Sequence, residues 1–460
     1  MWSPTLPTGA APVYERLTAA LAADIAAGVL KAGDRLPPHR DLAFRLGVGV
    51  GTVTRAYAEA ERKGLLAGHV GRGSFVAATP VDGARPVDGP IDFARSLPPL
   101  APARQHLAAA MNRLARRPEL ADRLGYAPPG GFPVDLAVGA AWLRQVHDWP
   151  GLQASRLVSC SGAQQAVAVA LGLACHPGDA VIAEAATFAG VKSLAGHMDY
   201  RLAPAAMDAE GLTPDGLDRA AAESGAKAAY VLPTQNPTGR VMGEARRRQI
   251  VAVARRRDLI LVEDDLFGAY AGGFDLPPRT PLAALAPERT LFASALSKSV
   301  APGLRVGWLV LPDAGDWLGR ALSVLHAIAL GGPTFGGLIA TGWIEDGIAE
   351  AILKANREEL RRRTDLALDI LGEAAERPAM AGSPHVWLPM NELEAERVAG
   401  RALRSGVELT PPDGPILDRA AMAGLRLCLG GAADLLTLER GLRAVKTALS
   451  PGAAANRTLI

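Results

Sequence analysis

The chain has 460 residues, of which 49% are hydrophobic and 21% are charged, a balance typical of globular proteins with sizeable cores. This length predicts about three compact units. The net charge of +2 excludes a strongly basic or acidic chain, yet residues 1–77 hold nine lysines and arginines against six acidic residues, so the positive charge is gathered at the amino-terminal end.

Cysteine usage and apolar runs indicate the compartment. Cys160, Cys175 and Cys428 show no CxxC spacing and lie in apolar runs, which predicts buried thiols in a reducing compartment. The longest apolar run, residues 166–175, is too short to span a membrane, and residues 1–12 lack a signal-peptide pattern. We therefore expect a cytoplasmic protein with no membrane partner, and the sequence predicts no metal site.

Residues 1–78 are predicted to form a first, mainly helical module. A helix that ends at Gly28 is predicted by apolar residues that recur at four-residue steps: Val13, Leu17, Leu21 and Ile25. Residues 40–46 and 52–63 predict two further helices around a tight turn, and a glycine-rich tip at 71–73 predicts a β-hairpin. Helix, helix, turn, helix and hairpin with surplus positive charge form the outline of a winged helix-turn-helix.

In a winged helix-turn-helix, the third helix would lie in the major groove of double-stranded DNA. Thr52, Thr54 and Arg55 occupy the outer, amino-terminal part of this helix and would face base edges. Arg40, at the start of the second helix, and Arg72, at the hairpin tip, would meet phosphates or the minor groove. The alternative is a structural three-helix bundle whose arginines are only solvated.

Three stretches of this module closely resemble the GntR family of bacterial repressors. They are GDRLPPHRDLA at residues 33–43, LGV at 46–48 and GTVTRAY at 51–57. The resemblance implies a DNA operator as partner. The family usually has serine or threonine followed by arginine where this chain has Gly49-Val50, and the resemblance implies that this arginine contacts DNA. We therefore expect the departure to alter operator affinity or sequence preference.

Residues 79–90 are rich in turn formers and lack a periodic apolar face, which predicts a linker. From residue 91 onward, apolar strand-like runs alternate with helical stretches, the pattern of an α/β domain with a mostly parallel sheet. The predicted strands cover residues 156–160, 180–184, 228–232, 259–262, 290–294 and 306–311. Residues 91–460 are therefore predicted to form a second module.

Three polar residues follow predicted strands: Asn236, Asp264 and Lys298. Open α/β sheets bind ligands at the carboxyl ends of their strands. A lysine can form a Schiff base with an aldehyde, and pyridoxal phosphate is the usual partner. Asp264 would keep the pyridine nitrogen of that cofactor protonated, and Asn236 would bond its phenolate oxygen. The plain alternatives are a helix N-cap for Asp264, a turn at Asn236-Pro237 and a surface position for Lys298.

The phosphate of such a cofactor needs hydrogen-bond donors. A small-residue turn before an alanine-rich helix would present backbone N–H groups at Ser161, Gly162, Ala163 and Gln164. Arg305 would add a positive charge. Many such turns contain glycine without binding any ligand, so this turn becomes informative only together with the lysine, the aspartate and the asparagine.

Taken in this order, these residues resemble fold-type I, class I aminotransferases from about residue 91 to the end. The matching strings are SGAQQ at 161–165, NPTG at 236–239, EDD at 263–265, and SK followed by APGLR within 297–305. With the first module, the whole chain resembles the MocR/GabR subfamily of GntR regulators. The resemblance implies a pyridoxal phosphate domain with a large subdomain over about 125–330 and a smaller α/β subdomain over about 340–450, and it places Ser297 beside the cofactor.

The resemblance implies three further site residues. Tyr126, in YAPPGG at 126–131, matches the tyrosine that reaches the phosphate of the neighbouring subunit, which implies a homodimer with shared sites. Phe188 matches the aromatic residue that stacks on the cofactor ring, and a core phenylalanine is its alternative. Arg426, in GLRLCL at 424–429, matches the arginine that clasps a substrate carboxylate, and an internal salt bridge is its alternative.

Two positions depart from the aminotransferase pattern. Phe267 stands where the family has a tyrosine that shares the ring oxygen with the asparagine, and Ala295 replaces a serine that donates to the phosphate. The resulting interpretation is a transcriptional regulator that senses an amino acid or related amine through bound pyridoxal phosphate. The alternatives are a working aminotransferase with an accessory DNA-binding module and a cofactor-free dimerisation scaffold.

Overall fold

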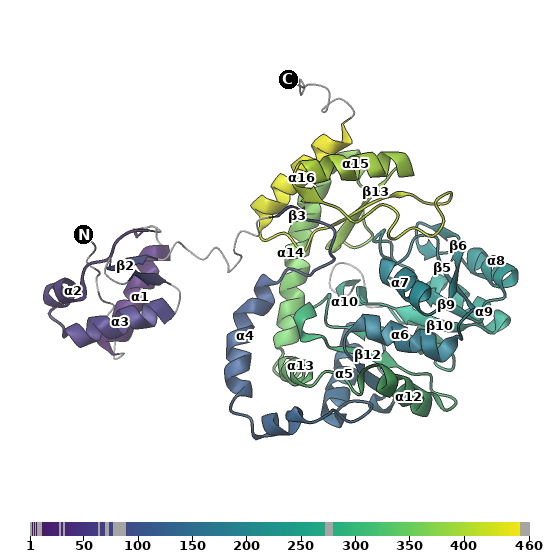
Figure 1. The fold of residues 1–460 in the computed structure, drawn as a ribbon, viewed down its shortest axis with the longest axis horizontal. Coiled ribbons are helices and arrows are strands. Elements are labelled where there is room, and N and C mark those ends of the chain that lie inside the picture. Colours follow the sequence, from purple (N-terminus) through teal and green to yellow (C-terminus); the bar gives the residue numbers. More distant parts are fainter. Residues whose placement is uncertain are drawn as a thin grey trace. The chain divides into compact units, whose positions relative to one another are not determined.

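The computed structural model describes residues 2, 4, 6, 12–26, 29–30, 33–62, 65–69, 73–76, 89–271 and 279–450. The chain divides into two compact units, residues 1–88 and 89–460 (Figure 1). Arg72 and the greater part of the predicted linker lie outside the described residues. Within the described ranges, no helix is long and apolar enough to cross a membrane, and no group of three or more histidine, cysteine, aspartate or glutamate side chains is placed to hold a metal ion.

As far as its residues are described, the first unit has three helices and a two-stranded antiparallel sheet: α1 (Val13–Ala26), α2 (His39–Leu46), α3 (Val50–Arg62), β1 (Leu66–His69) and β2 (Gly73–Val76). Leu17, Leu42 and Val53 are buried together in its core, as their spacing predicted. Gly47 ends α2 with a φ of 61°, a left-handed conformation that glycine adopts without a Cβ clash. The predicted winged helix-turn-helix is confirmed, although α3 begins two residues before Thr52, which is half-buried.

Among the described residues of the second unit, seven strands form the central sheet. They are β4 (Leu157–Cys160), β5 (Ala180–Glu184), β6 (Arg201–Ala205), β9 (Ala228–Val231), β10 (Ile260–Asp264), β11 (Thr290–Ala295) and β12 (Gly307–Val310). Their order is β4-β12-β11-β10-β9-β5-β6, with β12 antiparallel to both neighbours and the other pairs parallel. The predicted mostly parallel sheet is confirmed. The strand β6 at its edge was not predicted.

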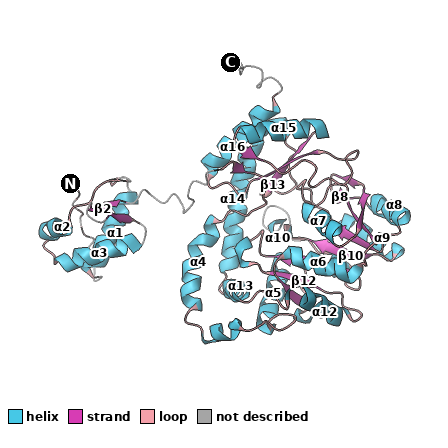
Figure 2. Ribbon diagram, viewed as in Figure 1, coloured by secondary structure: helices cyan, strands magenta, loops and turns pink. Residues whose placement is uncertain are grey.

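Helices cover both faces of this sheet (Figure 2). Successive residues of a strand face opposite sides, so each strand contributes side chains to a core on either face. Ala228 and Tyr230 of β9 share a core with helices α6 (Ala163–Ala174), α7 (Ala189–His197) and α12 (Trp317–Ala329). Ala229 and Val231 share a core on the other face with α8 (Pro214–Ser224), α9 (Glu244–Arg257) and α11 (Leu282–Leu285). Burial on both faces explains why these strands are continuous apolar runs in the sequence.

A third core joins the helices that flank the sheet to the smaller subdomain. It is formed by α4 (Ala101–Leu114), α5 (Pro133–Val146), α13 (Phe335–Glu345) and the first turns of α14 (Ile348–Leu371). The same α14 continues into a separate core with α15 (Glu392–Arg404) and α16 (Leu435–Leu449). The long helix α14 therefore ties the two parts of the second unit together.

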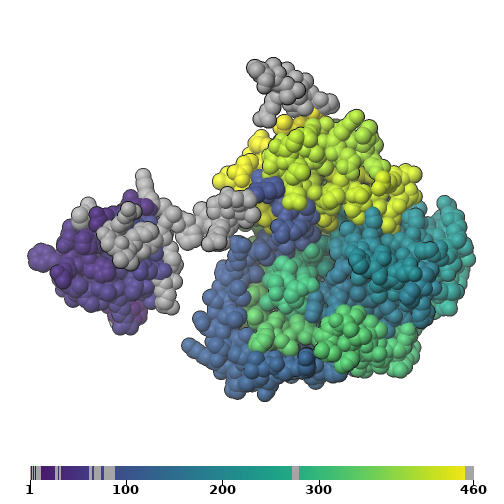
Figure 3. Space-filling model, viewed as in Figure 1, coloured from purple at the N-terminus to yellow at the C-terminus, as the bar shows by residue number. Residues whose placement is uncertain are grey.

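The smaller subdomain contains two short sheets. β13 (His385–Pro389) pairs antiparallel with β15 (Gly424–Cys428), and β3 (Ile91–Asp92) pairs parallel with β14 (Val407–Glu408). Residues near the start of the second unit therefore lie against residues near its end (Figure 3). Phe93 is fully buried in the core of this subdomain. The sequence pattern did not indicate this pairing of distant segments.

Candidate functional site

A pocket of about 160 Å³ gathers most of the predicted cofactor residues at the carboxyl ends of β9, β10 and β11. It is lined by Ala163, Gln164, Phe188, Leu232, Asn236, Asp264, Leu266, Phe267, Ser297, Lys298, Pro302 and Arg305. Leu232, Leu266 and Pro302 were not predicted from the sequence. Tyr126 is not part of this lining and lies on the surface of the chain, 84% exposed.

Lys298 follows β11 and is held at both its backbone and its side chain. Its Nζ donates to the backbone carbonyl of Ser96 at 2.5 Å, and the Tyr270 hydroxyl donates to the Lys298 carbonyl at 2.5 Å. Burial lowers the pKa of Lys298, and the Arg426 guanidinium lowers it too, whereas the Asp264 carboxylate acts in the opposite direction. A lowered pKa increases the fraction of neutral amine, which is the form that attacks an aldehyde.

Asp264 ends β10, is 5% exposed, and accepts a hydrogen bond at Oδ2 from the Tyr230 hydroxyl at 2.6 Å. Burial raises the pKa of Asp264 to about 7, whereas the hydrogen bond from Tyr230 and the Lys298 ammonium lower it. Glu184, at the end of β5, is fully buried, and burial raises its pKa to about 7 as well. A positively charged ring nitrogen beside Asp264 would favour the ionised carboxylate that burial disfavours.

The start of α6 lies where the sequence predicted the phosphate-binding turn. Gly162 precedes the helix with a φ of 90°, and no side chain caps the helix itself. Two of the four predicted N–H donors are already engaged, because the Ser161 N–H donates to Gln165 Oε1 at 2.5 Å and the Gly162 N–H donates to the Cys160 carbonyl at 2.8 Å. A Cβ at position 162 would lie 2.6 Å from Nη2 of Arg305, so the glycine leaves room for this guanidinium, which donates to the Ser161 carbonyl at 2.7 Å. Free helix N–H groups beside a guanidinium fit a phosphate. Ala295 is buried in a small apolar cluster and brings no hydroxyl to this end.

Arg426 lies on β15 and is 9% exposed. Its Nη1 donates to Asn236 Oδ1 at 2.8 Å, and its Nη2 donates to the Ala94 carbonyl at 2.8 Å and to Thr410 Oγ1 at 2.9 Å. These partners are neutral oxygen atoms, and its buried Nε has no hydrogen-bond partner among the described residues. No acidic partner supports the alternative of an internal salt bridge among the described residues, and Arg426 is not part of the pocket lining.

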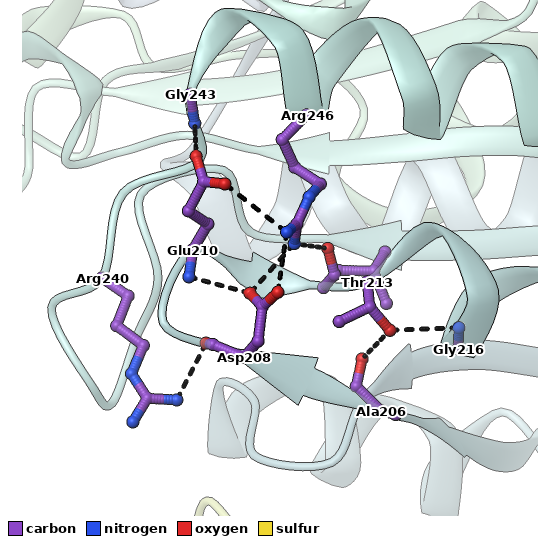
Figure 4. Close-up of polar contacts among 9 residues, drawn as sticks. Ala206, Asp208, Glu210, Thr213, Gly216, Arg240, Gly243 and Arg246 are labelled. Carbon is purple, nitrogen blue, oxygen red and sulfur yellow. Dashed lines mark hydrogen bonds and ion pairs between the residues drawn. The ribbon is translucent and has the colours of Figure 1, made fainter.

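The loop that carries Asn236 is anchored by neighbours that no motif identified. Gln235 is buried, and its Nε2 donates to the backbone carbonyl of a residue just after β5 at 2.6 Å. Arg240 donates to the carbonyl of Asp208, in a hairpin of β7 (Met207–Asp208) and β8 (Gly211–Leu212) whose side chains also bond to α9 (Figure 4). Arg240 also pairs with Glu376 at 2.8 Å, which ties the loop to the smaller subdomain.

Two aromatic residues form apolar parts of the pocket lining. Phe188 follows β5 and immediately precedes α7. Phe267 meets the ring of His385 edge-on, with the ring centres 5.4 Å apart. His385 is buried, and within the described ranges its two ring nitrogens have no hydrogen-bond partner. Burial lowers the pKa of His385 to about 3, and the nearby Arg426 guanidinium adds to this shift, so the imidazole is neutral.

In the first unit, the predicted DNA-binding side chains differ in their exposure and in their contacts with other side chains. Arg40 is exposed at the start of α2. Arg55 is also exposed, but its guanidinium lies over the Tyr14 ring of α1, 4.0 Å from the ring centre. The Thr54 hydroxyl lies 3.0 Å from Nδ1 of His39. Sequence reasoning missed Tyr14 and His39, because these contacts join different helices.

Two family models match the sequence. The model described as bacterial regulatory proteins, gntR family, matches residues 13–76, and the model described as aminotransferase class I and II matches residues 103–444. The chain belongs to the aminotransferase class I and II family. With its gntR-family helix-turn-helix, this aminotransferase-family chain has the organisation of MocR-type regulators and is a GntR and aminotransferase fusion regulator.

Similar proteins include uncharacterized HTH-type transcriptional regulators and an aminotransferase. The chain is 27% identical to the HTH-type transcriptional regulator YisV of Bacillus subtilis, over 96% of this chain and 97% of that protein. It is also 27% identical to the HTH-type transcriptional regulator YdeF of the same organism, over 79% of this chain and 78% of that protein. It is 28% identical to aromatic-amino-acid aminotransferase 1 of Thermococcus litoralis, over 67% of this chain and 75% of that enzyme.

Solved aminotransferase structures share the fold of the second unit. The kynurenine aminotransferase of Pyrococcus horikoshii matches with a TM-score of 0.68 at 23% identity, over 79% of this chain and 91% of that chain. The α-aminoadipate aminotransferase LysN of Thermus thermophilus matches with a TM-score of 0.69 at 24% identity, over 79% of this chain and 92% of that chain. The predicted fold-type I class is confirmed, and this fold typically binds pyridoxal phosphate.

Proposed function

We propose that this chain is a transcriptional regulator that holds pyridoxal phosphate at Lys298 and responds to an amino acid or related amine in the same pocket. The observation that carries the proposal is the convergence of Lys298, Asp264, Asn236 and Arg305 on one pocket beside the uncapped start of α6. A lysine for the aldehyde, a carboxylate for the ring nitrogen, an amide for the ring oxygen and cationic donors for the phosphate match the groups of this cofactor.

The cofactor, when bound, supplies an electron sink for chemistry at the carbon that bears the ligand's amine. The side chains of the pocket set the conditions for that chemistry. Asp264 provides the negative charge at the ring nitrogen, and the Tyr230 hydroxyl fixes the position of that carboxylate. Burial lowers the pKa of Lys298 and so raises the fraction of neutral amine, which can accept and return a proton next to the reacting carbon.

Arg426 indicates the class of ligand. Its unpartnered Nε and its neighbouring Nη2 form the side-on pair of donors that binds both oxygens of a carboxylate. Asn236 holds Nη1 at 2.8 Å and so fixes the plane of the guanidinium. The expected ligand therefore carries an amine for the Lys298 end of the pocket and a carboxylate for Arg426.

A working aminotransferase is the second candidate, and the joint presence of Lys298, Asp264 and Arg426 favours it. Phe267 and Ala295 favour the regulator, because neither offers the hydroxyl found at the matching family positions. Asn236 is then the side chain left to hold the ring oxygen. With fewer hydrogen-bond donors, the site would stabilise the negative charge of the cofactor less strongly, which fits a site that binds its ligand and turns it over slowly.

We also propose that two copies share their sites and bind double-stranded DNA. Tyr126 and Leu124 are exposed on the surface of the chain, and a second copy would cover them and bring Tyr126 to the phosphate end of the neighbouring pocket. Such a dimer presents two winged helices, so the operator should contain a repeated half-site. We assign DNA binding to residues 1–78, the linker to 79–90 and the pocket to 91–460.

Addition of pyridoxal phosphate to the purified full chain tests the cofactor site. We expect a new visible absorbance band, and borohydride reduction should fix the cofactor on the peptide that contains Lys298. The variant Lys298→Ala should show neither. Lys354→Ala, which changes a lysine on α14 outside the pocket lining, is the matched control and should behave as the wild type. The same absorbance band in Lys298→Ala would contradict the assignment.

A further inference from the structure

Residues 91–98, which we call the strap, run from the start of the second unit past the pocket. The strap begins three residues after the first unit ends at residue 88. Its first part is anchored in the smaller subdomain: the Phe93 N–H donates to the Glu408 carbonyl at 2.9 Å, and the Cys428 N–H donates to the Phe93 carbonyl at 2.9 Å. The strap is therefore continuous with the chain that leads to the DNA-binding unit.

Two carbonyls of the strap accept hydrogen bonds from the two cations that the proposed ligands need. Lys298 Nζ donates to the Ser96 carbonyl at 2.5 Å, and Arg426 Nη2 donates to the Ala94 carbonyl at 2.8 Å. The Thr410 hydroxyl also donates to the Ala94 carbonyl, at 3.1 Å. Hydrogen bonds from charged donors are about twice as strong as neutral ones. The position of residues 94–96 therefore depends on what Lys298 and Arg426 bind.

The proposed ligands compete directly with both strap contacts. A lysine ammonium has three N–H donors, and a nitrogen joined to a cofactor carbon by a double bond keeps at most one, so attachment at Lys298 weakens the bond to Ser96. A carboxylate that binds Arg426 side-on uses Nε and Nη2, and the N–H groups of Nη2 already donate to the Ala94 carbonyl and to Thr410 Oγ1. The carboxylate therefore competes with Ala94 and Thr410 for Nη2, and occupation of the pocket weakens charged hydrogen bonds to two carbonyls of the strap.

We propose that the strap transmits ligand occupancy from the pocket to the DNA-binding unit. The inference rests on the proposed function and names the route by which that site regulates DNA binding. When Lys298 and Arg426 bind their ligands, the hydrogen bonds from these two cations to residues 94–96 weaken, and residues 94–96 shift although the Thr410 hydroxyl still contacts Ala94. The change then passes to residues 89–91, the start of the second unit, and so to the chain that joins the two units.

Substitution of Asp92 alters the strap without replacing a residue of the pocket lining. Oδ1 of Asp92 accepts the N–H groups of Ala94 at 2.8 Å and of Arg95 at 2.9 Å, which sets the turn that presents both carbonyls. Asp92 is not part of the pocket lining. Asp418 makes the same kind of turn at another place, with its Oδ1 accepting the N–H groups of residues 420 and 421. Asp418→Ala is therefore the matched control for Asp92→Ala.

The first measurement is amide hydrogen exchange of residues 91–98 in the wild-type full chain, with and without pyridoxal phosphate. Loss of a hydrogen bond from a charged donor makes opening of the strap easier, so peptides that cover residues 94–97 should exchange about tenfold faster or more. Lys298→Ala should show no change on addition of the cofactor. Unchanged exchange in the wild type, with the visible band showing that the cofactor is attached, would overturn the inference and leave the proposed function standing.

The second measurement is the affinity of the full chain for the DNA upstream of its gene, with pyridoxal phosphate present and with or without a mixture of the common amino acids. We expect the mixture to change the affinity of the wild type and of Asp418→Ala. In Asp92→Ala, the mixture should still change the visible spectrum at similar concentrations, but the change in DNA affinity should be lost. A change in DNA affinity in Asp92→Ala equal to that of the wild type would overturn the strap as the route.

If pyridoxal phosphate fails to attach to the wild type, the proposed function is wrong, and the inference that rests on it is wrong as well.

Discussion

Removal of the Tyr230 hydroxyl tests whether Asp264 is held in place for a positively charged ring nitrogen. Tyr230→Phe removes one oxygen from a fully buried side chain and leaves its ring packed in the core under α6. The change takes from Asp264 Oδ2 the donor that lies 2.6 Å away. Because the pair is buried, bulk water does not replace the lost donor.

A hydrogen bond to a charged group contributes about 1.5–3 kcal/mol, so the affinity for pyridoxal phosphate should fall about 10- to 150-fold. The pH dependence has a definite sign. Burial raises the pKa of Asp264 to about 7, and the bond from Tyr230 opposes that shift. Without the bond the pKa rises further, so the ionised carboxylate is lost at a higher pH than in the wild type. The deficit in cofactor affinity should therefore grow as the pH is lowered from about 8 to about 6.

The assay is a titration with pyridoxal phosphate, followed by visible absorbance, at several pH values. Tyr200→Phe is the matched control, because Tyr200 is a buried tyrosine of the same core but is not part of the pocket lining. This control should bind the cofactor as the wild type does. An affinity of Tyr230→Phe within about twofold of the wild type at every pH would refute the role given to Tyr230.

Three further predictions concern the two ends of the pocket and the DNA-binding unit. Arg426→Lys keeps the charge but loses the planar fork, so spectral titration with amino acids should show binding as weak as in Arg426→Ala; a wild-type response in either variant would make the residue structural. Gly162→Ala places a Cβ 2.6 Å from Arg305, so cofactor affinity should drop well below that of Gly178→Ala, which strains a similar φ of 88° but meets no atom within 4 Å; equal affinities would exclude crowding of the guanidinium. Arg40→Ala should weaken DNA binding for every sequence and reduce the slope of log affinity against log salt by about one, as measured by mobility shift; an unchanged slope would place Arg40 away from phosphates.

The sequence was sufficient to predict six of the seven described strands of the central sheet and the strand-end residues. Strands buried on both faces read as short apolar runs. Asn236 and Lys298 follow two of them and Asp264 ends a third, so the rule for ligand binding at strand ends applied directly. The structure places all three in one pocket. The order of the strands needed the structure, because β12 is inserted antiparallel between β4 and β11.

Contacts between distant parts of the chain could not be predicted. The Lys298 bond to Ser96 joins residues 202 positions apart, and the Arg426 bond to Ala94 joins residues 332 positions apart. No spacing rule covers backbone carbonyls that accept from such distant side chains. The role of Tyr230 could not be predicted for a different reason. Tyr230 lies within an apolar strand, where a tyrosine is expected to be a core residue. Its hydroxyl reaches Asp264 only because its strand pairs with β10. The aromatic contact of Arg55 with Tyr14 likewise depends on how two helices pack.

The central claim is that an aminotransferase-like pocket controls DNA binding through Lys298. The most direct measurement is a mobility-shift titration of the upstream DNA with the wild type and with Lys298→Ala, in the presence of pyridoxal phosphate, with and without amino acids. We predict specific binding by both proteins at low salt, with an affinity that amino acids change in the wild type and leave unchanged in Lys298→Ala. Absence of specific DNA binding under all of these conditions, together with amino transfer that requires Lys298, would contradict the account and identify the chain as an aminotransferase.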